Sequence, residues 1–393
     1  MVSLRLWPER NRIYGKDSRQ QLLVTVRFSD GIERDVTSLV KFTSNDDSIA
    51  AVTPSGMVTA LRGGETAVVV RAPGLTAVTK VGVILDQRPV PKLPVNNFID
   101  RHVAAKLRSL HIPPSGAAAD HEFLRRVSID VTGVIPEPEE ARRFLADQSP
   151  DKRPRLVDGL LERPEYADYC AVYWGDHLSN TRQLLYNKGP YMFSRWLYQA
   201  FRGNLPYDQF VRHLVVSSGN MYDSPATSYY PFMRKELDMA SMTSQIFLGV
   251  SIKCARCHNH PLEKCTQDDY NAMAAVFTQV RYKGGGPRNN ERTLYVDFAR
   301  RFQHPDTKKS YDAKALGGPV LTGKGEMVDR RELFTDWRTA PDNPFFARAI
   351  VNRMWRQFMG RGLVEPVDEF RTTNPPTNAP LLDELARDFV EHK

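Results

Sequence analysis

Residues 26–74 read VRFSDGIERDVTSLVKFTSNDDSIAAVTPSGMVTALRGGETAVVVRAPG, and they determine how the amino-terminal part folds. Apolar and polar residues alternate here in short runs, which is typical of strands with one buried face. Turn-forming pairs separate the runs: Asp30-Gly31, Ser55-Gly56, Gly63-Gly64 and Pro73-Gly74. Short strands at this spacing, with no helical period between residues 18 and 86, predict a small antiparallel sandwich.

The order of these runs resembles the group 2 bacterial immunoglobulin-like domain. The features that carry the resemblance are the Asp-Gly turn, the Asp-Val-Thr step at 35–37, the centre DSIAAVTPSGMVTA at 47–60 and the strand GETAVVV at 64–70. The resemblance covers nearly all of residues 1–86 and implies an immunoglobulin-like sandwich. It also implies an extracytoplasmic spacer or adhesive module, with cell-surface or polysaccharide components as partners.

The rest of the chain is expected to be mainly α-helical, which makes the protein multidomain. Residues 87–97 are rich in proline and predict a semi-rigid linker. A helical period follows and predicts a helical domain over 98–281. Residues 282–330 are expected to be irregular, opening with a flexible glycine loop at 283–287. Helical pattern resumes over 331–393, where a further helical domain is expected to begin and to continue beyond the end of this chain.

The composition limits the classes of function. The formal net charge is +8 and the pI is about 9.2, but the basic residues are spread along the chain. They therefore indicate a solvated basic surface and no nucleic-acid groove. No stretch approaches the roughly 20 apolar residues of a membrane-spanning helix. The first residues lack the apolar core of a secretory signal, so an exported protein would need a start further upstream.

The sequence SIKCARCHNHPLEKCTQDD at 251–269 carries the most specific chemical signal. Cys254, Cys257 and His258 have the C-x-x-C-H spacing that attaches haem c. The two thiols lie about one turn apart, so they can bond the two vinyl groups of one porphyrin, and the adjacent histidine can bind the iron. The motif therefore predicts a haem c cofactor.

Two other interpretations of the same segment remain open. Cys254, Cys257 and Cys265 with His260 (or His258) would form a Cys3His set for a structural zinc ion. Alternatively, Cys254 and Cys257 could form a disulfide in an oxidising compartment. The fourth cysteine, Cys170, falls among aromatic residues and is expected to be a small buried apolar side chain.

The sequence also contains candidates for a sixth ligand of the iron and for a hydrolytic site. The candidates for the sixth ligand are Met239, Met242, Met273 and His177, although each methionine is more simply a core residue. A hydrolytic site would draw on His258, His260, Glu263, Asp268 and Asp269, with Asp176, His177 and Arg182 lining the same cavity. No nucleophile is evident, and Asp268-Asp269 could equally cap the helix that follows.

Long phrases beyond residue 120 resemble two known families. FLRRVSIDVTGVIPEPEEARRFL, RPRLVDGLLERPEYADYCAVYWGDHL, RWLYQAFRGNLPYDQFVRHLV and QIFLGVSIKCARCHNHPLEKCTQDDYNAMAAVF resemble the planctomycete-type cytochrome-c-associated domain of unknown function. WRTAPDNPFFARAIVNRMWRQFMGRGLVEPVDEFRTTNPPTNAPLLDELA resembles the opening of the planctomycete surface-protein domain of unknown function. The resemblance implies a periplasmic or surface protein. With the motif, it predicts electron transfer to a redox partner; the alternatives are a zinc- or disulfide-stabilised interaction protein and a hydrolase of surface polymers.

Overall fold

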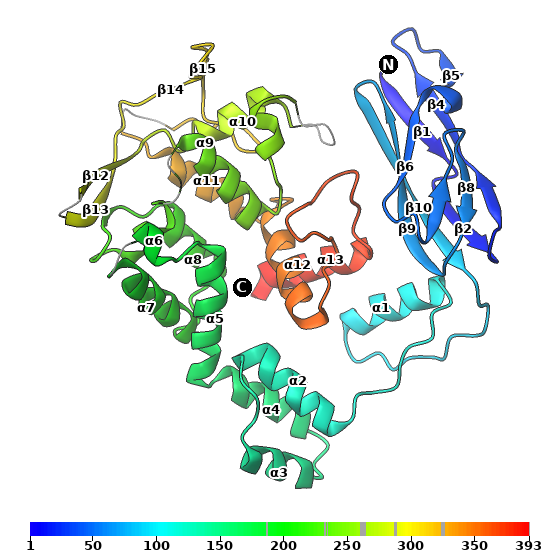
Figure 1. Cartoon of the computed structure of the whole chain (residues 1–393), viewed down its shortest axis with the longest axis horizontal. Coiled ribbons are helices and arrows are strands. Elements are labelled where there is room, and N and C mark those ends of the chain that lie inside the picture. Colours follow the sequence, from blue (N-terminus) through cyan, green and yellow to red (C-terminus); the bar gives the residue numbers. More distant parts are fainter. Residues whose placement is uncertain are drawn as a thin grey trace.

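The computed structural model describes residues 1–185, 188–231, 233, 235–259, 265–286, 289–323 and 327–392. A strand-rich amino-terminal module is followed by mainly helical structure, as the sequence predicts (Figure 1). In Figure 1 the module, in blue, lies to one side of the helices, and α1 lies beneath it.

The amino-terminal module consists of three small sheets. Their strand orders are β1-β4-β5, β2-β10-β9-β6 and β3-β8-β7, and all pairs are antiparallel except β2 with β10. The strands are β1 (Ser3–Trp7), β2 (Arg10–Tyr14), β3 (Arg19–Gln21), β4 (Leu23–Arg27), β5 (Glu33–Asp35), β6 (Lys41–Ser44), β7 (Ala50–Val52), β8 (Met57–Ala60), β9 (Gly64–Ala72) and β10 (Leu75–Ile84).

A valine-rich core holds the module together. Val68 and Val70 of β9 and Val81 and Val83 of β10 are at most 1% exposed and belong to one apolar cluster. These β-branched side chains pack well on a pleated surface, which is why the alternating runs of the sequence form strands.

Helices with ordinary start and stop signals make up most of the remaining structure. Pro138 and Pro164 stand at the first helical positions of α3 and α5, where the missing N–H costs no hydrogen bond, and Gly133 ends α2 in the left-handed conformation. The helices up to residue 274 are α1 (Phe98–Ser109), α2 (Asp120–Thr132), α3 (Pro138–Ala146), α4 (Lys152–Leu161), α5 (Pro164–His177), α6 (Arg182–Leu185), α7 (Gly189–Arg202), α8 (Tyr207–Val215), α9 (Glu236–Thr243) and α10 (Gln267–Ala274).

The expectation of an irregular segment over 282–330 is wrong for its first part. β12 (Val280–Gly286) and β13 (Asn289–Val296) form an antiparallel hairpin, and β11 (Gly219–Asn220) pairs with β13. The glycine run forms part of this ladder because Gly284, at φ +83°, takes up a register shift within it. A short pair, β14 (Phe302–Gln303) with β15 (Ser310–Tyr311), follows.

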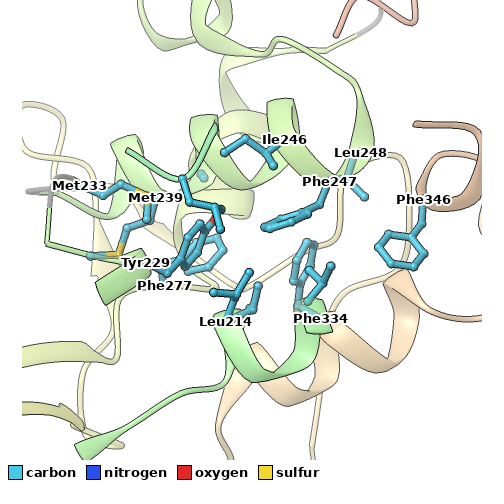
Figure 2. Close-up of a cluster of buried hydrophobic side chains, with 14 of the residues drawn as sticks. Leu214, Tyr229, Met233, Met239, Ile246, Phe247, Leu248, Phe277, Phe334 and Phe346 are labelled. Carbon is cyan, nitrogen blue, oxygen red and sulfur yellow. The ribbon is translucent and has the colours of Figure 1, made fainter. Parts of the chain in front are cut away.

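The carboxy-terminal helices share one hydrophobic core with the helices before them. They are α11 (Arg330–Arg338), α12 (Phe346–Met359) and α13 (Ala379–His392). Figure 2 shows Phe334 of α11 and Phe346 of α12 in the same cluster as Tyr229, Phe247 and Phe277. The expected boundary near residue 331 therefore does not coincide with a break in the core.

The amino-terminal module contacts both α1 and the carboxy-terminal segment. Lys106 of α1 forms an ion pair with Glu65 of β9 at 2.6 Å. The Asn45 side chain donates to the carbonyl oxygen of Thr373 at 2.9 Å, and Lys80 Nζ donates to that of Pro376 at 2.5 Å. In the described part of the chain, no helix combines the length and the apolar character needed to cross a membrane.

Candidate functional site

The C-x-x-C-H motif occupies a short surface turn between α9 and α10. Residues Lys253–Arg256 form a 3-10 turn, and the Cys257 amide donates to the carbonyl oxygen of Cys254 at 3.5 Å. Cys254 and Cys257 are exposed, whereas Ala255 between them is fully buried. One turn thus presents both thiols at the surface and is anchored by the small side chain between them.

The carboxy-terminal segment holds the chain that leads into the motif. A π-helical turn, Ser244–Leu248, ends at Gly249, which has φ +68°. The Phe370 amide donates to the Gly249 carbonyl oxygen at 2.9 Å, and a β-carbon on Gly249 would lie only 2.6 Å from the Phe370 ring. Only glycine accommodates both the left-handed conformation and this close approach.

His258 is exposed, and its ring has a defined hydrogen bond. Its Nδ1 lies 2.7 Å from the carbonyl oxygen of Asn259. A carbonyl oxygen can only accept, so Nδ1 carries the proton, and in the neutral ring Nε2 then keeps its lone pair. Metal-binding histidines commonly have this arrangement, in which a carbonyl fixes the tautomer. Two exposed thiols and an available Nε2 fit the requirements of haem c.

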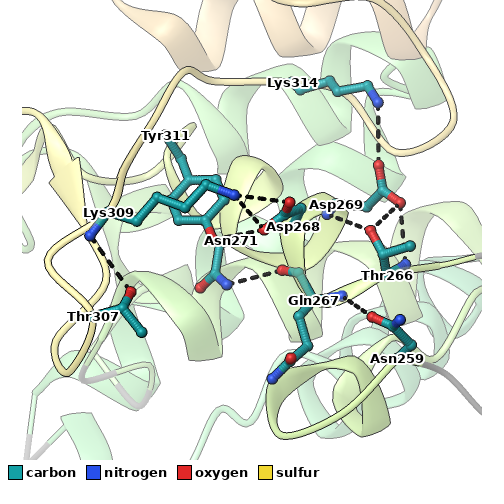
Figure 3. Close-up of polar contacts among 10 residues, drawn as sticks. All are labelled: Asn259, Thr266, Gln267, Asp268, Asp269, Asn271, Thr307, Lys309, Tyr311 and Lys314. Carbon is teal, nitrogen blue, oxygen red and sulfur yellow. Dashed lines mark hydrogen bonds and ion pairs between the residues drawn. The ribbon is translucent and has the colours of Figure 1, made fainter.

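Asn259 also connects the motif to α10. Its Oδ1 accepts from the Gln267 amide at 3.0 Å, at the start of that helix (Figure 3). Nothing in the sequence pattern marks Asn259, because the contact depends on how the chain returns to the motif after residue 265.

Asp268 and Asp269, which follow the motif, hold the start of α10 and form ion pairs with lysines. Thr266, and neither aspartate, is the N-cap of α10: its hydroxyl accepts from the Asp269 amide, while Asp269 accepts from the Thr266 amide. Asp269 also forms an ion pair with Lys314 at 3.1 Å. Asp268 accepts from Lys309 and from the Tyr311 hydroxyl, and these hydrogen bonds hold the pKa of Asp268 below its ordinary value (Figure 3).

The candidate methionine ligands belong to the core. Met239 is 3% exposed and Met273 is fully buried, and Met242 packs against the same cluster; Figure 2 shows Met239 among its aromatic members. His177 lies at the end of α5 with Nδ1 2.8 Å from the carbonyl oxygen of Tyr173, and burial lowers the pKa of its imidazole.

The remaining candidates are spread over the structure. Asp176 is exposed on the last turn of α5, and Arg182 lies in α6. Cys170 is half-buried on α5, and burial raises the pKa of its thiol to about 11. Cys265 is half-buried and its Sγ lies 3.8 Å from the carbonyl oxygen of Thr266.

Neither alternative chemistry at the motif has a formed site in the described structure. His260 and Glu263 lie outside the described residues. Among the described residues, no three histidine, cysteine or carboxylate side chains are grouped as metal ligands would be. Cys254 and Cys257 are free thiols and are not joined by a disulfide.

Two family models match the chain. Residues 98–282 match the family described as PSCyt2, a protein of unknown function (DUF1549), and residues 330–393 match PSD1, a protein of unknown function (DUF1553). These matches confirm the two resemblances found in the helical part of the sequence. A search of curated proteins gave no match to the chain.

Proposed function

We propose that this chain carries a covalently bound haem c and transfers electrons to a redox partner. Cys254 and Cys257 would form the thioether bonds, and His258 would bind the iron through Nε2. The observation that carries the proposal is the hydrogen bond from His258 Nδ1 to the Asn259 carbonyl oxygen, since it leaves Nε2 available on the same exposed turn as both thiols.

The residues around the motif have complementary roles in this proposal. When bound, haem supplies one-electron redox chemistry. The buried Ala255 anchors the turn, the Asn259 carbonyl fixes the His258 tautomer, and the contact of Asn259 with Gln267 joins the turn to α10. Met239 and Met273 are core residues, so the proposal assigns neither of them as a sixth ligand.

The proposed location is the periplasm or the cell surface. Attachment of haem c takes place outside the cytoplasm, and the resemblance of residues 1–86 to an immunoglobulin-like sandwich supports a spacer that contacts cell-surface polysaccharide. The strand-rich fold of the module, in which every strand pair but β2 with β10 is antiparallel, is consistent with such a sandwich. A hydrolytic role has less support, because Asp268 and Asp269 are engaged by Lys309 and Lys314.

The test is expression with an export signal in a host that has the haem c maturation system. We expect a reduced-minus-oxidised spectrum with the α-band of haem c and a mass gain of one haem. Both should be lost in a Cys254→Ala, Cys257→Ala variant and kept in Cys170→Ala, the matched control at a half-buried thiol.

Two results would contradict the proposal. A colourless protein with one equivalent of zinc would indicate a Cys3His zinc site that includes Cys265 and His260 in place of haem. A colourless protein without metal would leave the two cysteines either as free thiols or as a disulfide, and a mass gain of two hydrogens on reduction would identify the disulfide.

A further inference from the structure

A cleft of about 600 Å³ lies where the amino-terminal module meets the helical part. Its walls come from β2, β9 and β10 of the module, from α1, and from the loop that enters α13. These segments are far apart in the sequence but adjacent in Figure 1. The volume is within the range of pockets that bind small ligands.

Cationic side chains outnumber carboxylates in this cleft. Arg10, Arg12, Lys80 and Lys106 line it, against only Glu9 and Glu65. Glu65 is shared between Lys106, at 2.6 Å, and Lys80, at 4.0 Å. In the part of the chain that the structure describes, the side chains of Arg10 and Arg12 make no hydrogen bond or ion pair.

The strand register concentrates the positive charge. β2 and β10 are parallel neighbours, with Arg10 opposite Lys80 and Arg12 opposite Gly82. Arg10 and Arg12 are two residues apart, so their side chains leave the same face of the sheet, about 7 Å apart along the strand. Like charges on directly opposed strand positions are destabilising. An anion bound in the cleft would relieve that repulsion.

The electrostatics of Lys80 support the same conclusion. Burial lowers the pKa of this amine, and the neighbouring charges of Lys106 and Arg10 lower it further, against the opposing effect of Glu65. Glu65 therefore does not offset the combined effect of burial and these two cations on the amine.

Neutral acceptors line the cleft beside the cations. Ser109 Oγ donates to the Lys106 carbonyl oxygen at 2.8 Å, and Thr377 Oγ1 donates to that of Leu363 at 3.1 Å. Each hydroxyl proton is thus used within the protein, while the oxygen keeps its capacity to accept. A ligand for such a cleft would combine anionic groups with hydroxyl donors.

We propose that this cleft binds an acidic oligosaccharide, with its carboxylate or sulfate groups on Arg10, Arg12 and Lys80 and its hydroxyls on Ser109 and Thr377. This proposal rests on the role proposed above for the amino-terminal module, contact with cell-surface polysaccharide. It specifies acidic oligosaccharides as the class of ligand. It is independent of haem, so variants in the cleft leave the spectrum of the motif unchanged and the two proposals can fail separately.

The test is calorimetric titration of the full chain with a galacturonate trisaccharide and with a sulfated galactose disaccharide. We expect binding that weakens with salt, and at least about tenfold weaker binding in an Arg10→Ser, Arg12→Ser variant. The matched control is Arg5→Ser, Arg27→Ser, which removes the same charge from two exposed arginines on the β1-β4-β5 sheet. Its affinity should stay within about twofold of the unmodified chain.

Three outcomes would overturn the proposal. The first is that neither acidic sugar binds the unmodified chain. The second is that both double variants lose affinity equally, which would indicate attraction to net charge alone. The third is that inorganic sulfate or an uncharged galactose disaccharide binds as tightly as the acidic sugars, since the cleft would then not require both chemical groups.

Discussion

Arg331 and Asp329 form an ion pair at 2.8 Å inside the helical core, where the Arg331 side chain is 0% exposed and that of Asp329 is 10% exposed. Arg331 also donates to the carbonyl oxygens of Val215 and Ser217, at 3.2 and 2.9 Å. A guanidinium far from solvent is tolerated because its donors are directed at acceptors. The pair thereby joins the start of α11 to the end of α8.

Replacing Asp329 with alanine should strongly destabilise the protein. The substitution leaves a buried positive charge without its counter-ion, which typically costs about 3–5 kcal/mol in the free energy of unfolding. Urea denaturation followed by circular dichroism measures the loss. Asp336→Ala is the control, because the ion pair of Asp336 with Arg212 is exposed and should contribute less than about 1 kcal/mol. Equal losses in the two variants would contradict the prediction.

Replacing Arg338 with methionine should leave stability unchanged or raise it. Arg338 is 0% exposed, and none of its three guanidinium nitrogens has a hydrogen-bond partner among the described residues. It lies over the rings of Phe346, at 4.8 Å, and Phe247, at 5.8 Å. Methionine keeps the apolar contacts and removes an uncompensated charge.

Thermal melts of Arg338→Met and Arg331→Met make the comparison, since both remove a fully buried guanidinium from α11. Arg331→Met should lower the melting temperature, because it leaves the Asp329 carboxylate without its counter-ion. If Arg338→Met lowers it as much, then Arg338 has a partner of its own in solution, and the prediction fails.

The sequence predicts faces of elements better than it predicts partners. In α12 the sequence FFARAIVNRMWRQFMG predicts one apolar side that includes Phe346, Ile350 and Phe358. Phe346 and Ile350 do lie in the core, but Phe358 is 41% exposed at the end of the helix. Local periodicity also gives no sign that Arg331 is buried, because its partner Val215 is 116 residues away. The packing that compensates such a charge is set by tertiary contacts.

At the candidate site, too, the sequence predicts the motif but not the contacts that position it. The spacing of Cys254, Cys257 and His258 identifies a chemical motif without the structure. Whether the thiols are exposed, and which ring nitrogen of His258 is available, depend on the turn and on the Asn259 carbonyl. The sequence leaves Asp268-Asp269 open as either a cap of α10 or part of a hydrolytic site, but Thr266 provides the N-cap, because its hydroxyl is the acceptor that faces the Asp269 amide.

Asp269→Asn should reduce stability in a manner that depends on pH. Burial alone would raise the pKa of Asp269, but hydrogen bonds from Thr266 and the contact with Lys314 outweigh it and hold the pKa below its ordinary value. A carboxylate with a lowered pKa stabilises the fold above its unfolded-state pKa, near 3.8, and this stabilisation is lost as the pH falls through the folded-state value.

Unfolding curves between pH 2 and 7 measure this effect. At neutral pH the free energy of unfolding of the unmodified chain should be about 1 kcal/mol higher than that of Asp269→Asn. This difference should shrink below about pH 4. Asp268→Asn should lose much less stability, because the Asp268–Lys309 ion pair is exposed. A difference that stays constant down to pH 2 would show that the Asp269 charge contributes nothing.

In the haem-free protein, Cys254 and Cys257 should react rapidly with a thiol reagent at pH 8, and Cys170 should not. The motif thiols are exposed, whereas Cys170 is half-buried with a thiol pKa of about 11. At pH 8 only about one Cys170 thiol in a thousand is then ionised, and the thiolate is the reactive form. Peptide mapping after brief labelling distinguishes the sites, and labelling in denaturant gives the upper limit for each. Rapid modification of Cys170 in the folded chain would contradict its burial on α5, while a motif pair that reacts only after reduction would show that its thiols are already oxidised.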